Sequence, residues 1–250
     1  MTYCVAMLVR QGLVMISDSR TNAGIDNINT FRKLYLFERP GEAAMAMAVS
    51  GNLSVTQSVV NMVTEGLKNP ETGEIETLLG ATSMFKAAQL VGRAMRAVSN
   101  QDGDNMERHG AHFDAQILLG GQLKDRRLRL FLIYPAGNFI EASIDTPFLQ
   151  IGEHKYGKPI LDRAVTFETE LYAALKIALI SMDSTMRSNL AVGLPIDLAI
   201  LPRDALKIEL SYRIEQGDEY FSNLRQRWSE ALRATYQAIP RPPYAGVSGR

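Results

Sequence analysis

The second residue of the chain is a threonine, which directly follows Met1 and precedes the apolar run Tyr3–Val9. Removal of Met1 would leave one residue that carries both a hydroxyl and a free α-amine. A hydroxyl becomes an effective nucleophile when a base lies beside it, and a neutral α-amine is such a base. Thr2 could therefore attack an amide carbonyl, although threonine is also common at strand edges without any catalytic role.

Charged residues near the ends of the next predicted strands could assist this chemistry. Asp18 and Arg20 alternate along one strand, so their side chains are expected on one face. Lys33 opens a later strand, where it is expected to contribute little packing. An ammonium near a hydroxyl or an amine lowers the pKa of that group and can relay a proton. The alternative for each residue is an ordinary ion cluster at the end of a strand.

The elements that must position these residues follow from the periodicity of apolar side chains. Alternation predicts strands at 2–9, 13–19, 33–38, 43–50, 113–121, 128–135, 138–143, 148–152, 196–201 and 207–214. Spacings of three and four predict helices at 52–67, 83–99, 158–165, 168–184 and 218–237. The segment 21–30 and the segment 68–74 are predicted to be a turn-rich stretch and a loop.

The connections between strands are short, which favours antiparallel pairing. Two antiparallel sheets stacked face to face, each covered on its outer side by two helices, would bury all of these apolar faces. The sequence therefore predicts an α+β fold, a four-layer α/β/β/α sandwich. We expect a single domain over residues 1–237 and a flexible tail over 238–250, which is rich in proline and glycine.

The composition limits the possible partners and cofactors. The 27 basic and 27 acidic residues give a formal net charge of +0, so no global field favours nucleic acid or an anionic membrane. The sequence shows no signal peptide and no apolar run long enough for a membrane span. The only cysteine, Cys4, fits a reducing cytoplasm. His109 and His112 have a metal-compatible spacing, but Gly110 between them argues against a shared helix, so neither a metal nor a cofactor is expected.

The combination of Thr2, the segment SDSR that contains Asp18, Lys33 and the pair Ser50–Gly51 resembles the proteasome β-subunit family of N-terminal nucleophile hydrolases. The stretches MTYCVAM, SDSRTNAGIDNINTFRK and IGEHKYGKPILDR are most similar to one bacterial branch of that family, the Anbu peptidases. The resemblance extends from Thr2 to about Gln237.

This resemblance implies the N-terminal nucleophile hydrolase fold and a role for particular residues. Thr2 is then the nucleophile after an aminopeptidase removes Met1, Asp18 holds Lys33, and the N–H of Gly51 forms the oxyanion hole. In the segment ALISMDSTMRSN, Asp183 with Ser184 or Ser188 would support the amine of Thr2, and the spacing from Asp183 to Ser188 is longer than in the family pattern. The resemblance also implies a peptide groove along the strand edges, lined by Thr21, Asn22, Val49 and Leu53.

One residue departs from the family pattern. Glu153 stands where proteasome β-subunits have a serine after the glycine of IGE. A carboxylate only accepts hydrogen bonds, whereas a serine hydroxyl also donates. If Glu153 reaches the amine of Thr2, it would raise the pKa of that amine and slow catalysis at neutral pH. If it pairs instead with Lys155 or with a neighbouring subunit, it would leave the amine unaffected.

The function expected from these residues is that of a cytoplasmic threonine-type peptidase. It would cleave peptides or unfolded proteins through an acyl-threonine intermediate, in a homo-oligomer that forms a ring or an open helical assembly. Two alternatives stay open at this point. The chain could be a non-catalytic ring or scaffold subunit that retains Met1, or it could be an amidase or isopeptidase with a narrow specificity.

Overall fold

In the computed structural model, which describes residues 1–22, 28–111 and 113–244, the chain forms two five-stranded sheets in which every pairing is antiparallel. The first sheet has the order β12-β1-β2-β13-β14. Its strands are β12 (Phe148–Gly152), β1 (Tyr3–Val9), β2 (Gly12–Asp18), β13 (Ile196–Pro202) and β14 (Leu210–Ile214). Strands β1 and β2 are buried along their whole length, which explains their nearly continuous apolar sequences.

The second sheet has the order β11-β10-β9-β6-β5. Its strands are β11 (Phe139–Glu141), β10 (Arg129–Ile133), β9 (Ala115–Leu123), β6 (Ala43–Gly51) and β5 (Leu34–Arg39). Small residues in β6 and β9, such as Ala46 opposite Gly120, allow the two sheets to approach closely, because a Cβ on Gly120 would lie 2.6 Å from Leu13 of the first sheet. Side chains from both sheets form a hydrophobic core between them.

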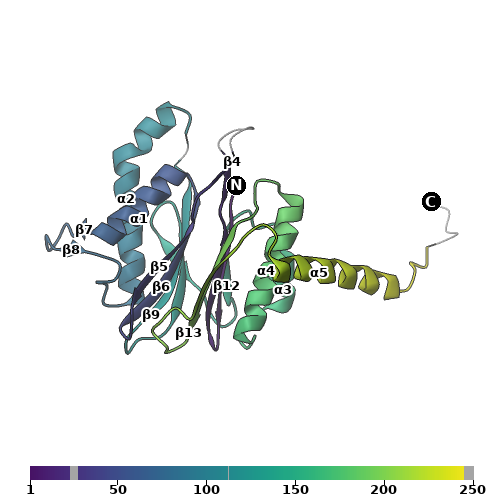
Figure 1. Cartoon of the computed structure of the whole chain (residues 1–250). Helices are drawn as coiled ribbons and strands as arrows, with labels where there is room; N and C mark the ends of the chain where they lie inside the picture. Colours follow the sequence, from purple (N-terminus) through teal and green to yellow (C-terminus); the bar gives the residue numbers. More distant parts are fainter. Residues whose placement is uncertain (23–27, 112, 245–250) are drawn as a thin grey trace. The chain divides into compact units, whose positions relative to one another are not determined.

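Two pairs of helices cover the outer faces of these sheets (Figure 1). Helices α1 (Leu53–Glu65) and α2 (Met84–Arg108) pack on the second sheet, where their apolar faces contribute to a separate hydrophobic core. Helix α4 (Leu171–Ser188) packs on β1 and β2 of the first sheet, and α3 (Lys158–Ala164) packs beside α4. The expected α+β fold, a four-layer α/β/β/α sandwich of two antiparallel sheets, is confirmed.

The structure differs from the sequence-based expectations mainly in its connections. The turn-rich stretch contains a short hairpin of β3 (Arg20–Asn22) and β4 (Ile28–Thr30), and the expected loop contributes to a second hairpin of β7 (Leu67–Lys68) and β8 (Ile75–Glu76). Helix α2 continues to Arg108, nine residues beyond the predicted end. The added turns are mostly polar and exposed, so apolar periodicity could not reveal them, and they include Gly103 in spite of its low helix propensity.

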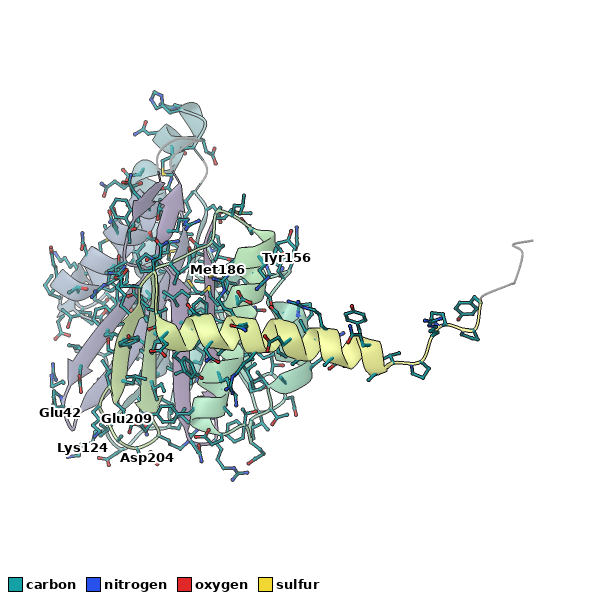
Figure 2. The ribbon with its side chains drawn as sticks, turned by 45° about the vertical axis from the view of Figure 1, so that its right-hand side comes forward. Glu42, Lys124, Tyr156, Met186, Asp204 and Glu209 are labelled. Carbon is teal, nitrogen blue, oxygen red and sulfur yellow. The ribbon has the colours of Figure 1, made fainter. Side chains whose placement is uncertain are left out.

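The two ends of the sandwich differ in what they carry. Glu42, Lys124, Asp204 and Glu209 lie at the end where the β5–β6 and β9–β10 hairpins and the β13–β14 connection turn (Figure 2). The chain begins at the opposite end (Figure 1), which is therefore the end that carries Thr2.

The described chain divides into two compact units, residues 1–216 and residues 217–250. The first contains the sandwich, and the second contains α5 (Glu219–Ala238) and the segment that follows it. Asp218 caps α5, because its carboxylate accepts the N–H of Phe221 at 2.8 Å. The expectation of one domain over 1–237 stays a prediction.

Candidate active site

Thr2 lies at the start of β1 with its side chain buried, while Met1 in front of it is exposed. The carbonyl of Thr2 accepts the N–H of Glu153 at 2.7 Å, which extends the β1–β12 pairing by one step. Gly152 makes this approach possible: it has a φ of +79°, and a Cβ there would lie 2.1 Å from the carbonyl oxygen of Thr2. The backbone of the nucleophile candidate is therefore fixed against the neighbouring strand.

Asp18 and Lys33 form a buried ion pair beside Thr2. Nζ of Lys33 lies 3.1 Å from Oδ1 of Asp18, and the same oxygen accepts the N–H of Tyr3 at 3.0 Å. Burial raises the pKa of the Asp18 carboxyl, and the Lys33 ammonium and the Tyr3 N–H limit that rise. One carboxylate oxygen of Asp18 thus contacts both Lys33 and the backbone of the residue that follows Thr2. The role of this pair in catalysis stays a prediction.

The position of Arg20 differs from the expected one. Arg20 contacts Lys33 through its backbone carbonyl, which accepts a hydrogen bond from Nζ of Lys33 at 2.6 Å. The guanidinium instead donates to the carbonyl of Leu190 at 2.9 Å and packs against Gly193. Alternation along a strand predicts the same face for Asp18 and Arg20, but β2 ends at Asp18 and the backbone leaves the sheet before Arg20.

Gly51 ends β6, the strand whose N–H at Val49 donates to the carbonyl of Lys33 at 3.0 Å. Gly51 has a φ of +100°, and a Cβ there would lie 1.9 Å from the carbonyl oxygen of Asp114. Only glycine fits this position, so the structure alone explains its presence. Gly51 is exposed, and the role of its N–H in the oxyanion hole stays a prediction.

Tyr3 anchors the start of β1 in a way that the sequence analysis missed. Its side chain is fully buried, and its hydroxyl donates to Oγ of Ser181 at 3.0 Å and accepts from Nε2 of Gln150 at 2.7 Å. Gly157 lies close against it, because a Cβ there would be 2.3 Å from the hydroxyl oxygen. These partners are far apart in sequence, so local patterns gave no signal of the network.

Glu153 is buried beside Thr2, with both carboxylate oxygens occupied by other donors. Oε1 accepts the backbone N–H of Lys155 at 3.2 Å, and Oε2 accepts from Nδ2 of Asn189 at 3.1 Å. The carboxylate therefore contacts the backbone of Lys155 and not its ammonium. Asn189 follows α4 and was not identified from the sequence.

Asp183 and Ser188, which were proposed to support the amine of Thr2, lie in different environments on α4. Asp183 is fully buried and its Oδ2 lies 3.1 Å from Nε of Arg187, whereas Ser188 is the last residue of the helix and is exposed. Ser181, also on α4, reaches the start of β1 by a side-chain hydrogen bond to Tyr3. The roles of Asp183 and Ser188 stay predictions.

The four candidate groove residues also differ in exposure. Thr21 lies on β3 half-buried, and its Oγ1 has no hydrogen-bond partner among the described residues, so it could bind a ligand. Leu53 is half-buried at the start of α1. Val49 is only 1% exposed and packs in the core under α1, so its side chain does not line an open groove. Asn22 lies on β3, but its side chain is outside the described residues.

Metal sites and membrane-spanning helices are two further features that the described residues bear on. Among the described residues, no three His, Cys, Asp or Glu side chains cluster as metal ligands, and His112 is outside those residues. In the same part of the chain, no helix is long and apolar enough to cross a membrane.

Comparisons with known proteins agree with this geometry, although no family model matches the sequence. A curated relative, the proteasome subunit beta of Haloquadratum walsbyi, is 22% identical over 209 residues, which cover 83% of this chain and 76% of that protein. Solved structures are much more similar. The Anbu (ancestral beta-subunit) protein of Yersinia bercovieri is 48% identical with a TM-score of 0.87, and the match covers 96% of this chain and 98% of that one.

Two further structures show the same similarity. Anbu from Hyphomicrobium sp. strain MC1 is 47% identical with a TM-score of 0.87, over 96% of this chain and 99% of that one. A structure described as the helical assembly of the Anbu complex from Pseudomonas aeruginosa is 46% identical with a TM-score of 0.89, over 98% of this chain and 99% of that one. Since nearly the whole of each chain is matched at these identities, the protein belongs to the Anbu branch of the proteasome β-subunit family.

Proposed function

We propose that this protein is a cytoplasmic threonine-type peptidase whose nucleophile is Thr2 after removal of Met1. The observation that carries the proposal is the buried Asp18–Lys33 pair, whose carboxylate also holds the N–H of Tyr3, directly beside Thr2. A buried ion pair is weak evidence for stability, because the desolvation of both charges offsets their attraction. Buried charged groups with perturbed pKa values are more frequent at functional sites than in ordinary cores.

The reaction follows from the groups at the start of β1. While Met1 is attached, the nitrogen of Thr2 is an amide and cannot accept a proton. Once it is a free amine, it can take the hydroxyl proton as Oγ attacks a peptide carbonyl, and it can return this proton to the leaving amine. The C–N bond breaks, an acyl-threonine ester forms, and water then hydrolyses the ester to regenerate the hydroxyl.

Lys33 and Gly51 would act on different charges in this reaction. The ammonium of Lys33 disfavours a second positive charge nearby, so it would keep the amine of Thr2 in its neutral, basic form. The reference pKa of an α-amine, ~7.7–8.0, is already close to the working range of a general base. The N–H of Gly51 would stabilise the oxyanion of the tetrahedral intermediate, a contact typically worth roughly 3–4 kcal/mol.

We also propose that the chain acts as a homo-oligomer on peptides or unfolded proteins. The support for assembly is the relative from Pseudomonas aeruginosa, which is described as a helical assembly. Repetition of one head-to-tail contact gives a ring when it closes and an open helix when it does not.

Intact mass measurement combined with active-site labelling tests the catalytic proposal. Protein purified from its native cells should lack the mass of one methionine residue, and a peptide epoxyketone should add one label that maps to Thr2. A Thr2→Ala variant serves as the matched control and should stay unlabelled. Complete retention of Met1, together with no labelling, would refute the peptidase and favour the scaffold alternative.

A further inference from the structure

A cleft of about 590 Å³ opens between β5 and β14, the edge strands of the two sheets, and α1 contributes to its wall. Half-buried aromatic side chains line the β5 side. Charged and polar side chains line the side formed by β13 and β14. The residues that matter here are Arg32, Tyr35 and Phe37 on the first side, and Asp197, Ser211 and Arg213 on the second.

The cleft begins beside the catalytic candidates. Arg32 and Leu34, which both line it, flank Lys33 in sequence. On the other sheet, Asp197 follows Ile196, whose Cα pairs with that of Asp18. Beyond the far end of the cleft the sheets are joined, because the N–H of Ile208 donates to Oε1 of Glu38 at 3.2 Å. The cleft therefore runs along the sheet edges away from the Asp18–Lys33 pair.

Polar atoms in this cleft lack partners. Oδ2 of Asp197 and the Nε and Nη2 atoms of Arg213 are three of the six buried side-chain polar atoms without a hydrogen bond in the described residues. Nε of Arg213 lies 3.4 Å from Asp197 and 3.5 Å from Glu215, as ion pairs without hydrogen-bond geometry. Unsatisfied buried groups are rare and costly, so three in one cleft indicate that something else binds there.

The missing partner must both donate and accept hydrogen bonds. An acceptor is needed for Nη2 of Arg213, and a donor is needed for Oδ2 of Asp197. A peptide group offers a carbonyl and an N–H together. Strands β5 and β14 are each an edge strand of their sheet. Edge strands carry backbone groups that can pair with an added extended segment.

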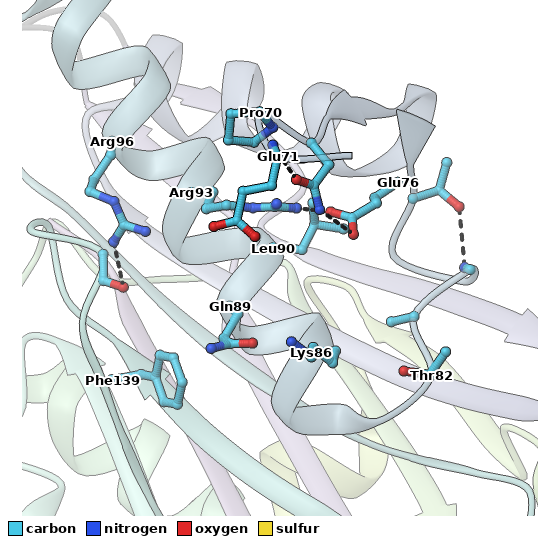
Figure 3. Close-up of a pocket in the computed structure, with 15 residues that line it drawn as sticks. Pro70, Glu71, Glu76, Thr82, Lys86, Gln89, Leu90, Arg93, Arg96 and Phe139 are labelled. Atoms are coloured by element: carbon cyan, nitrogen blue, oxygen red, sulfur yellow. Dashed lines mark hydrogen bonds and ion pairs between the residues drawn. The ribbon is translucent and has the colours of Figure 1, made fainter. Parts of the chain in front are cut away.

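The pocket on the outer side of α2 provides a contrast (Figure 3). It has a similar volume, about 510 Å³, but two of its charged groups, Glu76 and Arg93, form an ion pair. Glu76 accepts hydrogen bonds from Arg93 and Asn69, and Arg96 donates to the carbonyl of Gly137 at 3.2 Å. Among its buried side-chain polar atoms, Nε of Arg93 lacks a partner in the described residues. In the described part of the chain, this pocket therefore has no buried, unpartnered acceptor to match that donor.

We infer that the cleft between β5 and β14 is an exosite for an extended segment of a polypeptide substrate. The main chain of that segment binds Asp197 and Arg213 and pairs with a sheet edge, while its side chains contact Tyr35 and Phe37. This inference rests on the proposed peptidase function, since it assigns long, unfolded polypeptides as the substrate class. A peptide that spans both the cleft and Thr2 binds more tightly than one that reaches only Thr2.

Binding to the Thr2→Ala protein tests the exosite without turnover. Two fluorescent, unstructured peptides that share one sequence, of four and of twelve residues, are titrated by anisotropy. We expect the longer peptide to bind at least about tenfold more tightly. Two variants should each remove the higher affinity for the longer peptide: Ser211→Trp, which fills the cleft from an exposed position, and Arg213→Gln. Arg39→Gln, in the exposed Arg39–Glu42 pair at the end of the same β5, is the matched control and should keep it.

A third peptide separates main-chain pairing from side-chain contact. Methylation of alternate backbone nitrogens in the twelve-residue peptide removes its donors and should abolish the advantage of length. Equal affinity for both lengths, or no binding of either, would overturn the inference. A fall in sedimentation coefficient for Ser211→Trp would also overturn it, by showing that the cleft is a contact between subunits. If length-dependent binding is found but the Met1-free protein does not hydrolyse peptides, peptide binding in the cleft stands, while the proposed function and the assignment of the bound segment as a substrate fail.

Discussion

Nζ of Lys33 lies 3.1 Å from Oδ1 of Asp18, and both side chains are almost completely removed from solvent. The sequence suggested a strand-end lysine that contributes little packing, and the structure shows that this was wrong. Removal of one partner leaves the other as a buried, uncompensated charge, which typically costs about 3–5 kcal/mol. Any test of Lys33 must therefore separate catalysis from stability.

Lys33→Met should abolish turnover and also destabilise the fold. Without the ammonium, the already raised pKa of the Asp18 carboxyl rises further, so the folded protein binds a proton more tightly than the unfolded chain. The lost stability should then be partly recovered at low pH and should fall as the pH increases towards neutrality. Denaturant unfolding at several pH values measures this effect.

The double variant Lys33→Met/Asp18→Asn separates the role of Lys33 in catalysis from its role in stability. It removes both charges and keeps an acceptor for the N–H of Tyr3, so stability should recover while activity should not. Lys33→Arg should be nearly inactive, because a guanidinium stays charged and does not fit between Asp18 and the carbonyl of Arg20. Lys158→Met, at an exposed lysine, is the control. Near-normal activity of Lys33→Arg would show that only the positive charge matters.

Tyr3→Phe should lower both stability and kcat. The substitution leaves Ser181 and Gln150 without their buried partner, which typically costs about 1–3 kcal/mol. It also loosens the residue that follows Thr2, so kcat should fall more than KM rises. Tyr156→Phe, at an exposed tyrosine, should change neither quantity. A stable Tyr3→Phe protein with unchanged kcat would show that the ring of Tyr3 contributes packing and that its hydroxyl matters for neither stability nor catalysis.

Cys4 should be unreactive in the native protein, although it lies only two residues from Thr2. Burial, assisted by the charge of Asp18, raises the pKa of its thiol to about 12. At pH 8 only about one thiol in ten thousand would be ionised, and the thiolate is the reactive form. Iodoacetamide should therefore leave activity intact, and mass spectrometry should find alkylation only after unfolding. Rapid inactivation with one label on Cys4 would transfer the role of nucleophile to the thiol.

Glu153→Gln should shift the acidic limb of the kcat/KM profile to lower pH, by about one unit. The substitution removes a negative charge from the residue whose backbone N–H binds the carbonyl of Thr2, so the amine of Thr2 should lose its proton more readily and be a free base at lower pH. Glu168→Gln, at an exposed glutamate paired with Arg10, is the matched control. An unchanged profile would mean that Glu153 serves only to hold Asn189 and the backbone at Lys155.

Helix α5 should contribute to a homo-oligomer. Tyr220, Leu232 and Tyr236 are each at least half exposed on this helix, and exposed apolar and aromatic side chains commonly mark interfaces. The double variant Leu232→Glu/Tyr236→Glu should lower the sedimentation coefficient at micromolar concentration, and Arg233→Gln should not. A wild-type protein that sediments as a monomer of 27.7 kDa would exclude the assembly.

The sequence by itself determined the layers of this protein. Short apolar runs in β1, β2, β6 and β9 and the three-and-four spacing in α1 and α4 specify which segments must be buried, and their burial leaves few arrangements. Thr2, Asp18 and Lys33 could be identified for the same reason: they lie at or beside the ends of strands that local patterns reveal. Where the pattern is polar, as in the last turns of α2, it predicted the end of the helix wrongly.

The tertiary structure alone decided which distant groups meet at the start of β1. Tyr3 binds Ser181, which is 178 residues away, and Glu153 binds Asn189 across 36 residues. Such contacts depend on how β12 and α4 pack around β1, and no local periodicity encodes the result. Val49 shows the same limit, because strand alternation places its side chain on one of two faces and only the packing of α1 decides that this face is closed. Burial of Lys33, likewise, follows from the second sheet meeting the first, and not from its position at the end of a strand.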